Sequence, residues 1–201
     1  MKWNIPALLL CGLLSMAATS DLKELQIGEK APLADREMKD ISGDSFSLDE
    51  LKKSNGLLVI FSCNTCPFVI GWEDQYPLLA DIAERNDIGM VLVNSNEKKR
   101  GDEDSMEAMQ QHALEKGYKS AYVIDENNVL ADAFGARTTP HVYLFNKDLQ
   151  LVYRGSINNK YENKDKVATE FYLQNAIVQL MSNKPIDLAE TRQIGCSIKR
   201  I

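Results

Sequence analysis

The chain has 201 residues, of which 44% are hydrophobic and 26% charged, and its formal net charge at pH 7 is -6. This length suits one domain with extensions, which can bury a core without disulfide crosslinks. The basic residues are scattered, and we interpret the longest basic cluster, Lys98-Lys99-Arg100, as a solvated loop. An acidic chain without a concentrated basic face does not suit nucleic-acid binding, so we expect no nucleic-acid partner.

The first twenty residues differ from the rest of the chain. Residues 5–14 form a short apolar stretch, and the small residues that follow suit a signal-peptidase site at 15–17 or 18–20. The stretch is short for a transmembrane helix. We therefore predict a signal peptide over 1–20 and a periplasmic or extracellular protein, with an uncleaved membrane anchor as the alternative. Residues 21–201 are expected to form a single domain.

Three buried strands are predicted along the chain. A lead-in over 21–56 contains short strand-like pieces, which predict an N-terminal strand extension, and a short helical turn near 49–53. The apolar runs that follow it are typical of strands covered on both faces. These runs are LLVIF at 57–61, IGMVLVN at 88–94 and AYVID at 121–125.

Helical patterns lie between these strands. Apolar residues recur at helical spacing from 67 to 84, and Pro77 should kink this helix or start a new one. A second helix is predicted over 104–116, where Asp104 and Glu107 resemble a capping box.

The last third of the chain predicts a helix, a hairpin and a closing helix. The first helix covers 128–134, and the hairpin strands are HVYLFN at 141–146 and QLVYRG at 150–155. The closing amphipathic helix is predicted over 166–181, with a tail after it.

This order predicts an α/β fold. Alternating strands and helices give a mainly parallel central sheet with helices on both faces, and the antiparallel hairpin makes that sheet mixed. Active sites of such sheets lie beyond the carboxyl ends of the strands. Cys63 lies there, directly after the 57–61 strand.

The C-x-x-C pair of Cys63 and Cys66 is the main chemical signal. Outside the signal segment only Cys196 accompanies it, and a disulfide between neighbours three positions apart closes too small a ring to stabilise a chain much. At a helix N-terminus the pKa of Cys63 should fall, making it the nucleophile. Cys66 lies within disulfide reach and should resolve the mixed disulfide.

Zinc sites also use C-x-x-C, usually as two pairs or with two closely spaced histidines. Here the only histidines are His112 and His141, and no pattern links them to the pair. We therefore predict no metal site and no bound cofactor, since the electrons would reside in the cysteines. Two inert buried thiols remain a further alternative.

Thr139-Pro140 is the second signal. A proline at the entrance to a buried strand is often cis, and a cis bond would leave the Thr139 backbone free to pair with an extended substrate. An ordinary trans proline in a loop is the alternative.

Together these features resemble the thioredoxin-like superfamily, in particular its redoxin or AhpC/TSA-like (peroxiredoxin-like) branch. The resemblance covers about residues 24–156 and rests on LLVIFSCNTCP and on Thr139-Pro140 followed by a hairpin. Residues 157–201 are then expected to form the C-terminal helix and tail. A narrower resemblance, to a bacterial group of thioredoxin-like proteins, rests on CNTCPFV, GARTTPHVYLF, YRGSI and GCSIK. The resemblance to the superfamily implies a cis Pro140 facing the cysteine pair, with Thr139 and Pro140 binding substrate.

The chain departs from that resemblance at three places. Thr65 stands where strongly oxidising relatives favour His, which favours a reductase or electron relay. Leu57 replaces the buried Asp that assists proton transfer in thioredoxin. The late motif ends in Arg200 and Ile201 instead of Trp. Cys196 within that motif is either a third thiol approaching Cys63 or, our preferred interpretation, a small buried residue of the tail.

We therefore predict an exported thiol–disulfide oxidoreductase that exchanges disulfides with protein thiols. Its electron partner is expected to be a thiol-based donor or acceptor protein, with a membrane-embedded one as an alternative. A thiol peroxidase is the main alternative. Peroxiredoxins need Pro-x-x-x-Thr/Ser-x-x-Cys, but Gly56 and Ile60 precede Cys63 at these positions, and Val59 and Cys63 precede Cys66. A copper chaperone using Cys63, Cys66 and His141 is a weaker alternative.

Overall fold

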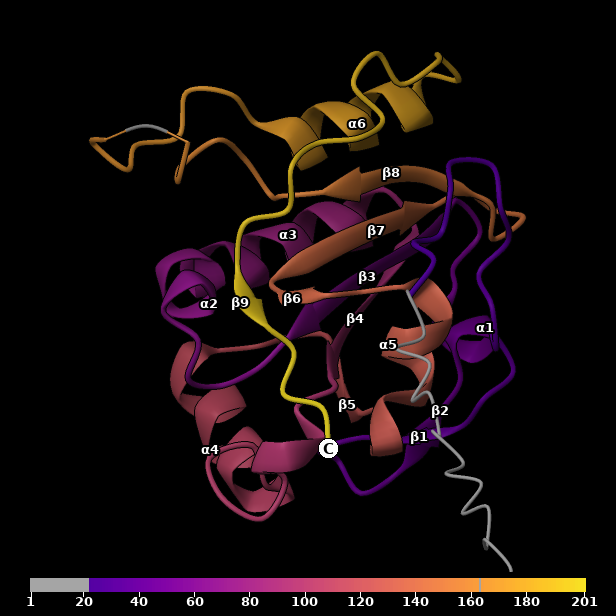
Figure 1. Ribbon diagram of the computed structural model, residues 1–201. Coiled ribbons are helices and arrows are strands. Elements are labelled where there is room, and N and C mark those ends of the chain that lie inside the picture. The colour runs from indigo at the N-terminus through magenta and orange to yellow at the C-terminus, as the bar shows by residue number, and fades with distance from the viewer. Residues whose placement is uncertain (1–21, 163) are drawn as a thin grey trace, which may run out of the picture.

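The computed structural model describes residues 22–162 and 164–201, which surround a five-stranded sheet (Figure 1). The predicted signal segment, 1–20, lies outside the described residues. In sheet order the strands are β5 (Ala121–Ile124), β4 (Ile88–Asn94), β3 (Gly56–Ser62), β7 (His141–Phe145) and β8 (Leu151–Gly155). The β5–β4–β3 pairs are parallel and the β3–β7–β8 pairs antiparallel, so the predicted α/β fold with a mixed sheet is confirmed.

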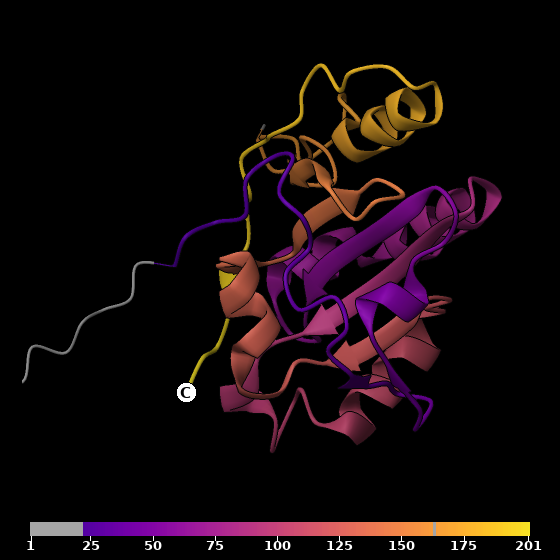
Figure 2. The same ribbon diagram turned by 90° about the vertical axis from the view of Figure 1, so that its right-hand side faces the viewer.

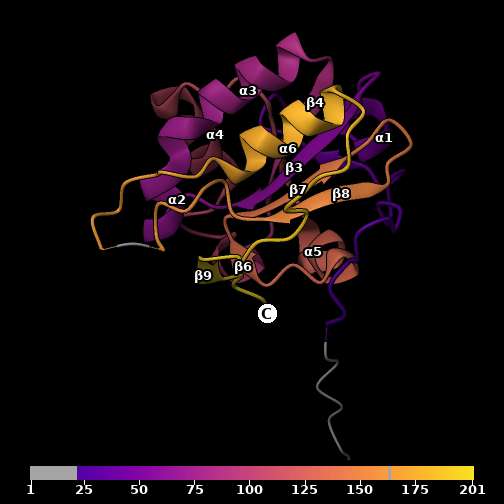
Figure 3. The same cartoon turned by 90° about the horizontal axis from the view of Figure 1, so that it is seen from above.

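Strands β3 and β4 are buried along their whole length because helices or chain segments cover both faces of the sheet. Alternate side chains therefore enter two separate cores. One face carries α2 (Pro67–Trp72), α3 (Tyr76–Arg85), α4 (Met106–Lys116) and α6 (Tyr172–Met181). The other carries α1 (Leu48–Leu51), α5 (Val129–Phe134) and the N-terminal lead-in, as the views from the side and from above show (Figures 2 and 3).

The predicted helix over 67–84 is divided in the structure. A 3-10 turn, η1 (Glu73–Gln75), separates α2 from α3. Pro77 lies in the first turn of α3, where its missing N–H leaves no hydrogen bond unmade. The expectation that Pro77 starts a new segment is confirmed.

Two predicted helix starts are wrong. Helix α4 is capped by Ser105, whose side chain accepts the Ala108 N–H at 3.2 Å, so Asp104 is not the cap. Helix α6 begins at Tyr172 instead of 166. Asn159 Oδ1 accepts the N–H groups of Thr169 and Glu170, and these bonds hold the preceding segment in a loop.

Short elements complete the fold. Two more 3-10 turns are η2 (Glu97–Lys99) and η3 (Glu126–Asn128). The predicted N-terminal extension is a hairpin of β1 (Met38–Lys39) and β2 (Ser45–Phe46). The C-terminal tail contributes β9 (Cys196–Ser197), which pairs antiparallel with β6 (Thr138–Thr139) beside the central sheet. Within the described residues, no helix combines the length and the apolar character that crossing a membrane requires.

Candidate active site

The structure brings both predicted catalytic cysteines and Thr139 together. Cys63 directly follows β3, and Cys66 is the N-cap residue of α2. Their side chains are 1% and 5% exposed. Cys63 Sγ lies 3.3 Å from the Thr139 hydroxyl oxygen, and Cys66 Sγ lies 3.2 Å from the Thr139 carbonyl oxygen. The Thr139–Pro140 peptide bond is cis, as the resemblance implied.

Cys196 is not the small buried tail residue that we preferred from the sequence. It forms a disulfide with Cys66 across a sequence separation of 130, and Cys63 is a free thiol. Cys196 therefore does approach the pair, but its bond is to Cys66 and not to Cys63. The sequence placed Cys196 in a motif without indicating which side chain it meets.

The Thr139 backbone is not free for a substrate strand in this structure. Strand β9 pairs with it, so that Thr139 lies opposite Cys196 and Thr138 opposite Ser197. Figure 1 shows this yellow C-terminal segment passing between α2 and α5 beside β6. The tail of the chain thus occupies the position where we expected an external peptide.

The pKa of the Cys63 thiol is raised, whereas the sequence predicted a lowered value. Burial is the largest cause, the hydrogen bond with Thr139 opposes it, and the negative charge of Asp104 raises the pKa further. Cys63 precedes the helix by several residues, because α2 begins only at Pro67. The backbone N–H groups of Thr65 and Cys66 at the start of the helix still lower the pKa of Cys63, but burial outweighs them, so the predicted lowering is wrong.

A buried polar network at the carboxyl ends of the strands supports the cysteine loop. Asp104 Oδ1 accepts the Asn64 N–H at 2.9 Å and the Asn94 side-chain amide at 2.8 Å, and Oδ2 accepts the Asn96 amide at 3.0 Å. Arg100 donates to the Asp104 and Asn94 carbonyls, so it is not part of a solvated basic loop as we expected. Asn94, Asn96 and Asp104 lie close together in the sequence, but their spacing matches neither a metal-ligand motif nor a catalytic motif. The sequence therefore did not reveal this network.

Cys63, Cys66 and Cys196 line one cavity of about 260 Å³. Lys99 and Glu103 form an ion pair at 2.8 Å on its rim. The remaining lining residues are Thr65, Pro67, Asn96, Ser197 and Lys199. A small compartment that holds a free thiol next to a disulfide suits thiol–disulfide exchange.

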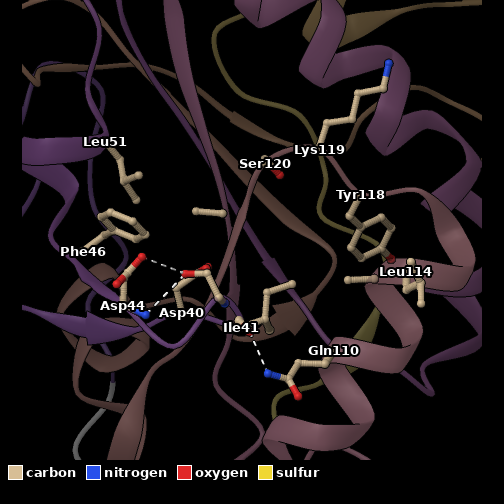
Figure 4. A pocket seen from close by; sticks show the side chains of 13 residues that line it. Asp40, Ile41, Asp44, Phe46, Leu51, Gln110, Leu114, Tyr118, Lys119 and Ser120 are labelled. Carbon is tan, nitrogen blue, oxygen red and sulfur yellow. Dashed lines mark hydrogen bonds between the residues drawn. The ribbon is translucent and has the colours of Figure 1, made fainter.

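A larger cavity of about 710 Å³ lies elsewhere, between the β1–β2 hairpin and α4 (Figure 4). Asp40, Phe46 and Tyr118 line it, and Gln110 donates a hydrogen bond to the Ile41 carbonyl oxygen across it at 2.7 Å. No cysteine lines this cavity. Its size alone therefore does not make it a candidate for redox chemistry.

His141 does not join the cysteines, contrary to the copper alternative. Its Nδ1 lies 3.1 Å from the Tyr143 hydroxyl oxygen, and its Nε2 lies 3.3 Å from Glu24. Burial lowers the pKa of His141 to about 3, with Arg154 contributing, so the ring stays neutral. In the part of the chain that the structure describes, no three His, Cys, Asp or Glu residues are grouped to hold a metal ion. Leu57 is buried in the other core from the cysteines.

Comparisons with known proteins agree with this architecture. The Redoxin family model matches residues 26–170. An uncharacterised conserved protein from Geobacillus kaustophilus is 31% identical, with coverage of 87% of this chain and 92% of that one and a TM-score of 0.81. A hypothetical protein from Sinorhizobium meliloti is 29% identical, with coverage of 89% and 97% and a TM-score of 0.81.

A more distant structure shows the fold alone. The thioredoxin domain of a thiol-disulfide oxidoreductase from Bacteroides vulgatus is 17% identical, with coverage of 65% of this chain and 89% of that one and a TM-score of 0.55. No functionally curated protein matches the chain. Because the family match spans well over half of the sequence, this thioredoxin-like protein belongs to the Redoxin family.

Proposed function

We propose that the protein is an exported thiol–disulfide oxidoreductase that exchanges disulfides with protein thiols through Cys63 and Cys66. The observation that carries this proposal is the contact of both sulfur atoms with one residue, Thr139, inside a single cavity. Cys63 attacks a disulfide of the partner protein, and Cys66 in its thiol form then attacks Cys63 and releases the reduced partner. A thiol-based donor protein, periplasmic or embedded in the membrane, returns the electrons.

The direction of exchange that we propose is reduction or electron relay. A low pKa at the attacking cysteine stabilises the reduced protein and makes its disulfide oxidising. Here burial raises the pKa of Cys63, and Thr65, the exposed residue between the two cysteines, brings no positive charge. Both observations support a weakly oxidising site.

A disulfide-reduction assay tests this function. Insulin and dithiothreitol are mixed with the full chain, and precipitation of the reduced insulin B chain is followed by turbidity. Wild type should accelerate the reaction, whereas Cys63→Ser should leave only the rate of dithiothreitol itself. Unfolding curves of both proteins establish that the variant is folded. Equal acceleration by wild type and Cys63→Ser would contradict the proposal.

A thiol peroxidase is the second candidate, favoured by the free Cys63 thiol with the Thr139 hydroxyl 3.3 Å away. Gly56 and Ile60 occupy the positions where peroxiredoxins carry Pro and Thr or Ser, and both are buried in β3. Consumption of hydrogen peroxide with dithiothreitol as reductant separates the two functions. Faster turnover with peroxide than with insulin would favour the peroxidase.

A further inference from the structure

Cys66 shares a contact residue with one cysteine and is bonded to another. Cys63 and Cys66 both contact Thr139, while Cys66 is bonded to Cys196 from the opposite segment of the chain. We propose that Cys196 is a third redox-active thiol of this site, which receives the disulfide from Cys63 by exchange at Cys66. This inference rests on the proposed function and adds a reacting residue to it.

The seat of Cys196 is built by contacts other than its disulfide. Its neighbour Ile198 is buried and donates its N–H to the Arg137 carbonyl oxygen at 2.9 Å. Lys199 donates its N–H to Asn96 Oδ1 at 2.8 Å, and Arg200 pairs with Asp132 at 2.8 Å. These contacts, with the β6–β9 pairing, keep Cys196 beside Cys66 when the disulfide is open.

Gly195 shows how closely the tail fits against the active-site loop. A Cβ atom at this position would lie 2.3 Å from the Thr139 carbonyl oxygen and 2.7 Å from its carbonyl carbon. Backbone atoms cannot rotate away as a flexible side chain does, so a side chain here displaces β9 from Thr139. A glycine at this position therefore permits the approach that brings Cys196 to Cys66.

The transfer step needs no outside oxidant or reductant. The Cys63 thiol loses its proton, and its thiolate attacks Cys66 Sγ of the Cys66–Cys196 disulfide. A Cys63–Cys66 bond forms while the Cys66–Cys196 bond breaks, and Cys196 leaves as a thiolate that takes up a proton. The reverse step moves the disulfide back to Cys196 and regenerates the Cys63 thiol. The three cysteines hold one disulfide and one thiol in both states, so the site neither gains nor loses electrons.

The burial of the three cysteines supports different roles for them. Cys63 and Cys66 are buried, whereas Cys196 is only partly buried. An external dithiol donor therefore reaches the disulfide at Cys196 Sγ, where its thiolate releases Cys66 as a thiolate. The second thiol of the donor then attacks the mixed disulfide and frees Cys196 in its reduced form, so the donor is oxidised and the site gains two electrons.

Alkylation of the oxidised full chain tests the transfer. The protein is incubated with iodoacetamide without reductant, and each alkylated cysteine and disulfide is identified by peptide mass mapping, with Cys11 followed separately. We expect two products: one alkylated at Cys63 with a Cys66–Cys196 disulfide, and one alkylated at Cys196 with a Cys63–Cys66 disulfide. If the first is the only product, no exchange occurs and Cys196 is a structural crosslink, which overturns the inference.

Two glycine variants sharpen this test. Gly195→Ala should shift the product ratio towards alkylated Cys196 by about tenfold to 100-fold, because misplacing reacting groups by about an ångström has effects of this size. Gly101→Ala is the matched control, since a Cβ atom there meets nothing within 4 Å, and its ratio should equal that of wild type. Equal product ratios in both variants would show that the pairing of β9 with β6 does not hold Cys196 beside Cys66, which overturns this part of the inference.

Failure of the inference and failure of the proposed function are distinguishable with Cys196→Ser. This variant should still form the Cys63–Cys66 disulfide in oxidised dithiothreitol and should reduce insulin, but more slowly than wild type, because the donor can no longer enter at Cys196. If it does neither while its unfolding curve shows a folded protein, the Cys63–Cys66 exchange itself is wrong. If it does both and wild type yields only alkylated Cys63, the proposed function stands and the role of Cys196 is wrong.

Discussion

The two partners of Cys66 are held in place by different means. Cys63 is positioned by the end of β3, whose seven residues are all buried in the centre of the sheet. Cys196 is positioned by a two-residue strand at the periphery, through backbone pairing and a few side-chain contacts. The site therefore combines a half that is fixed by the core with a half that depends on the fit of the tail, and each half should respond to different substitutions.

Cys66→Ser should have the largest effect because Cys66 belongs to both halves. Insulin reduction should be lost, and Cys63 and Cys196 should both become alkylated in oxidising buffer, whereas the structure has only Cys63 free among its described cysteines. Peptide mass mapping counts these thiols. A Cys63–Cys196 crosslink in this variant would show that the two halves can meet without Cys66.

Asp104→Asn should weaken both halves, since Asp104 holds Asn64 beside Cys63 and Asn96, which in turn binds the tail through Lys199. The loss of buried hydrogen bonds to a charged acceptor should lower the free energy of unfolding by about 2–3 kcal/mol. Urea denaturation measures this change.

The same variant tests the charge next to Cys63. Removing the carboxylate should lower the pKa of the Cys63 thiol, because Asp104 raises it. Asp102→Asn is the control, since Asp102 is exposed and should change neither quantity by much. An unchanged free energy of unfolding in Asp104→Asn would contradict the role we assign to the network.

The pH dependence of Cys63 alkylation examines the core-fixed half alone. Because burial raises its pKa, Cys63 stays a protonated thiol at neutral pH, and its alkylation rate should rise only above the ordinary thiol range. Thr139→Val removes the hydroxyl that lowers the pKa of Cys63. The midpoint of the curve of alkylation rate against pH should therefore move to a still higher pH. The urea-unfolded protein is the reference, and a midpoint at or below its value would refute the raised pKa.

Arg200→Ala should have the smallest effect and should act on the tail alone. Its ion pair with Asp132 is partly exposed, and its guanidinium also donates to the Ala136 carbonyl oxygen, so the free energy of unfolding should fall by about 1–2 kcal/mol. The rate at which Cys196 is alkylated in the oxidised protein should rise slightly, as in Gly195→Ala, because the tail holds Cys196 beside Cys66 less firmly. Lys147→Ala, which removes an exposed pair with Asp148, is the control and should leave that rate unchanged.

The difference between the half of the site that is fixed by the core and the half that depends on the tail explains which features could be predicted from the sequence. The apolar runs fixed the three parallel strands and the position of Cys63, because burial on both faces leaves a local pattern. The pairing of Cys196 with Cys66 left no such pattern, since it depends on how residues 130 positions apart meet. Asp104 was misread as a helix cap because its role comes from three amide donors that only the fold assembles.

Because Cys66 and Cys196 are far apart in the sequence, the position of the disulfide should affect how well the protein resists heat and denaturants. A crosslink spanning 130 positions lowers the entropy of the unfolded chain by an amount equivalent to about 5 kcal/mol of stability, on a loop-closure model. A disulfide within the C-x-x-C loop contributes only about 2 kcal/mol on the same model. When the disulfide moves from Cys196 to Cys63, the protein therefore keeps its oxidation state but becomes easier to unfold.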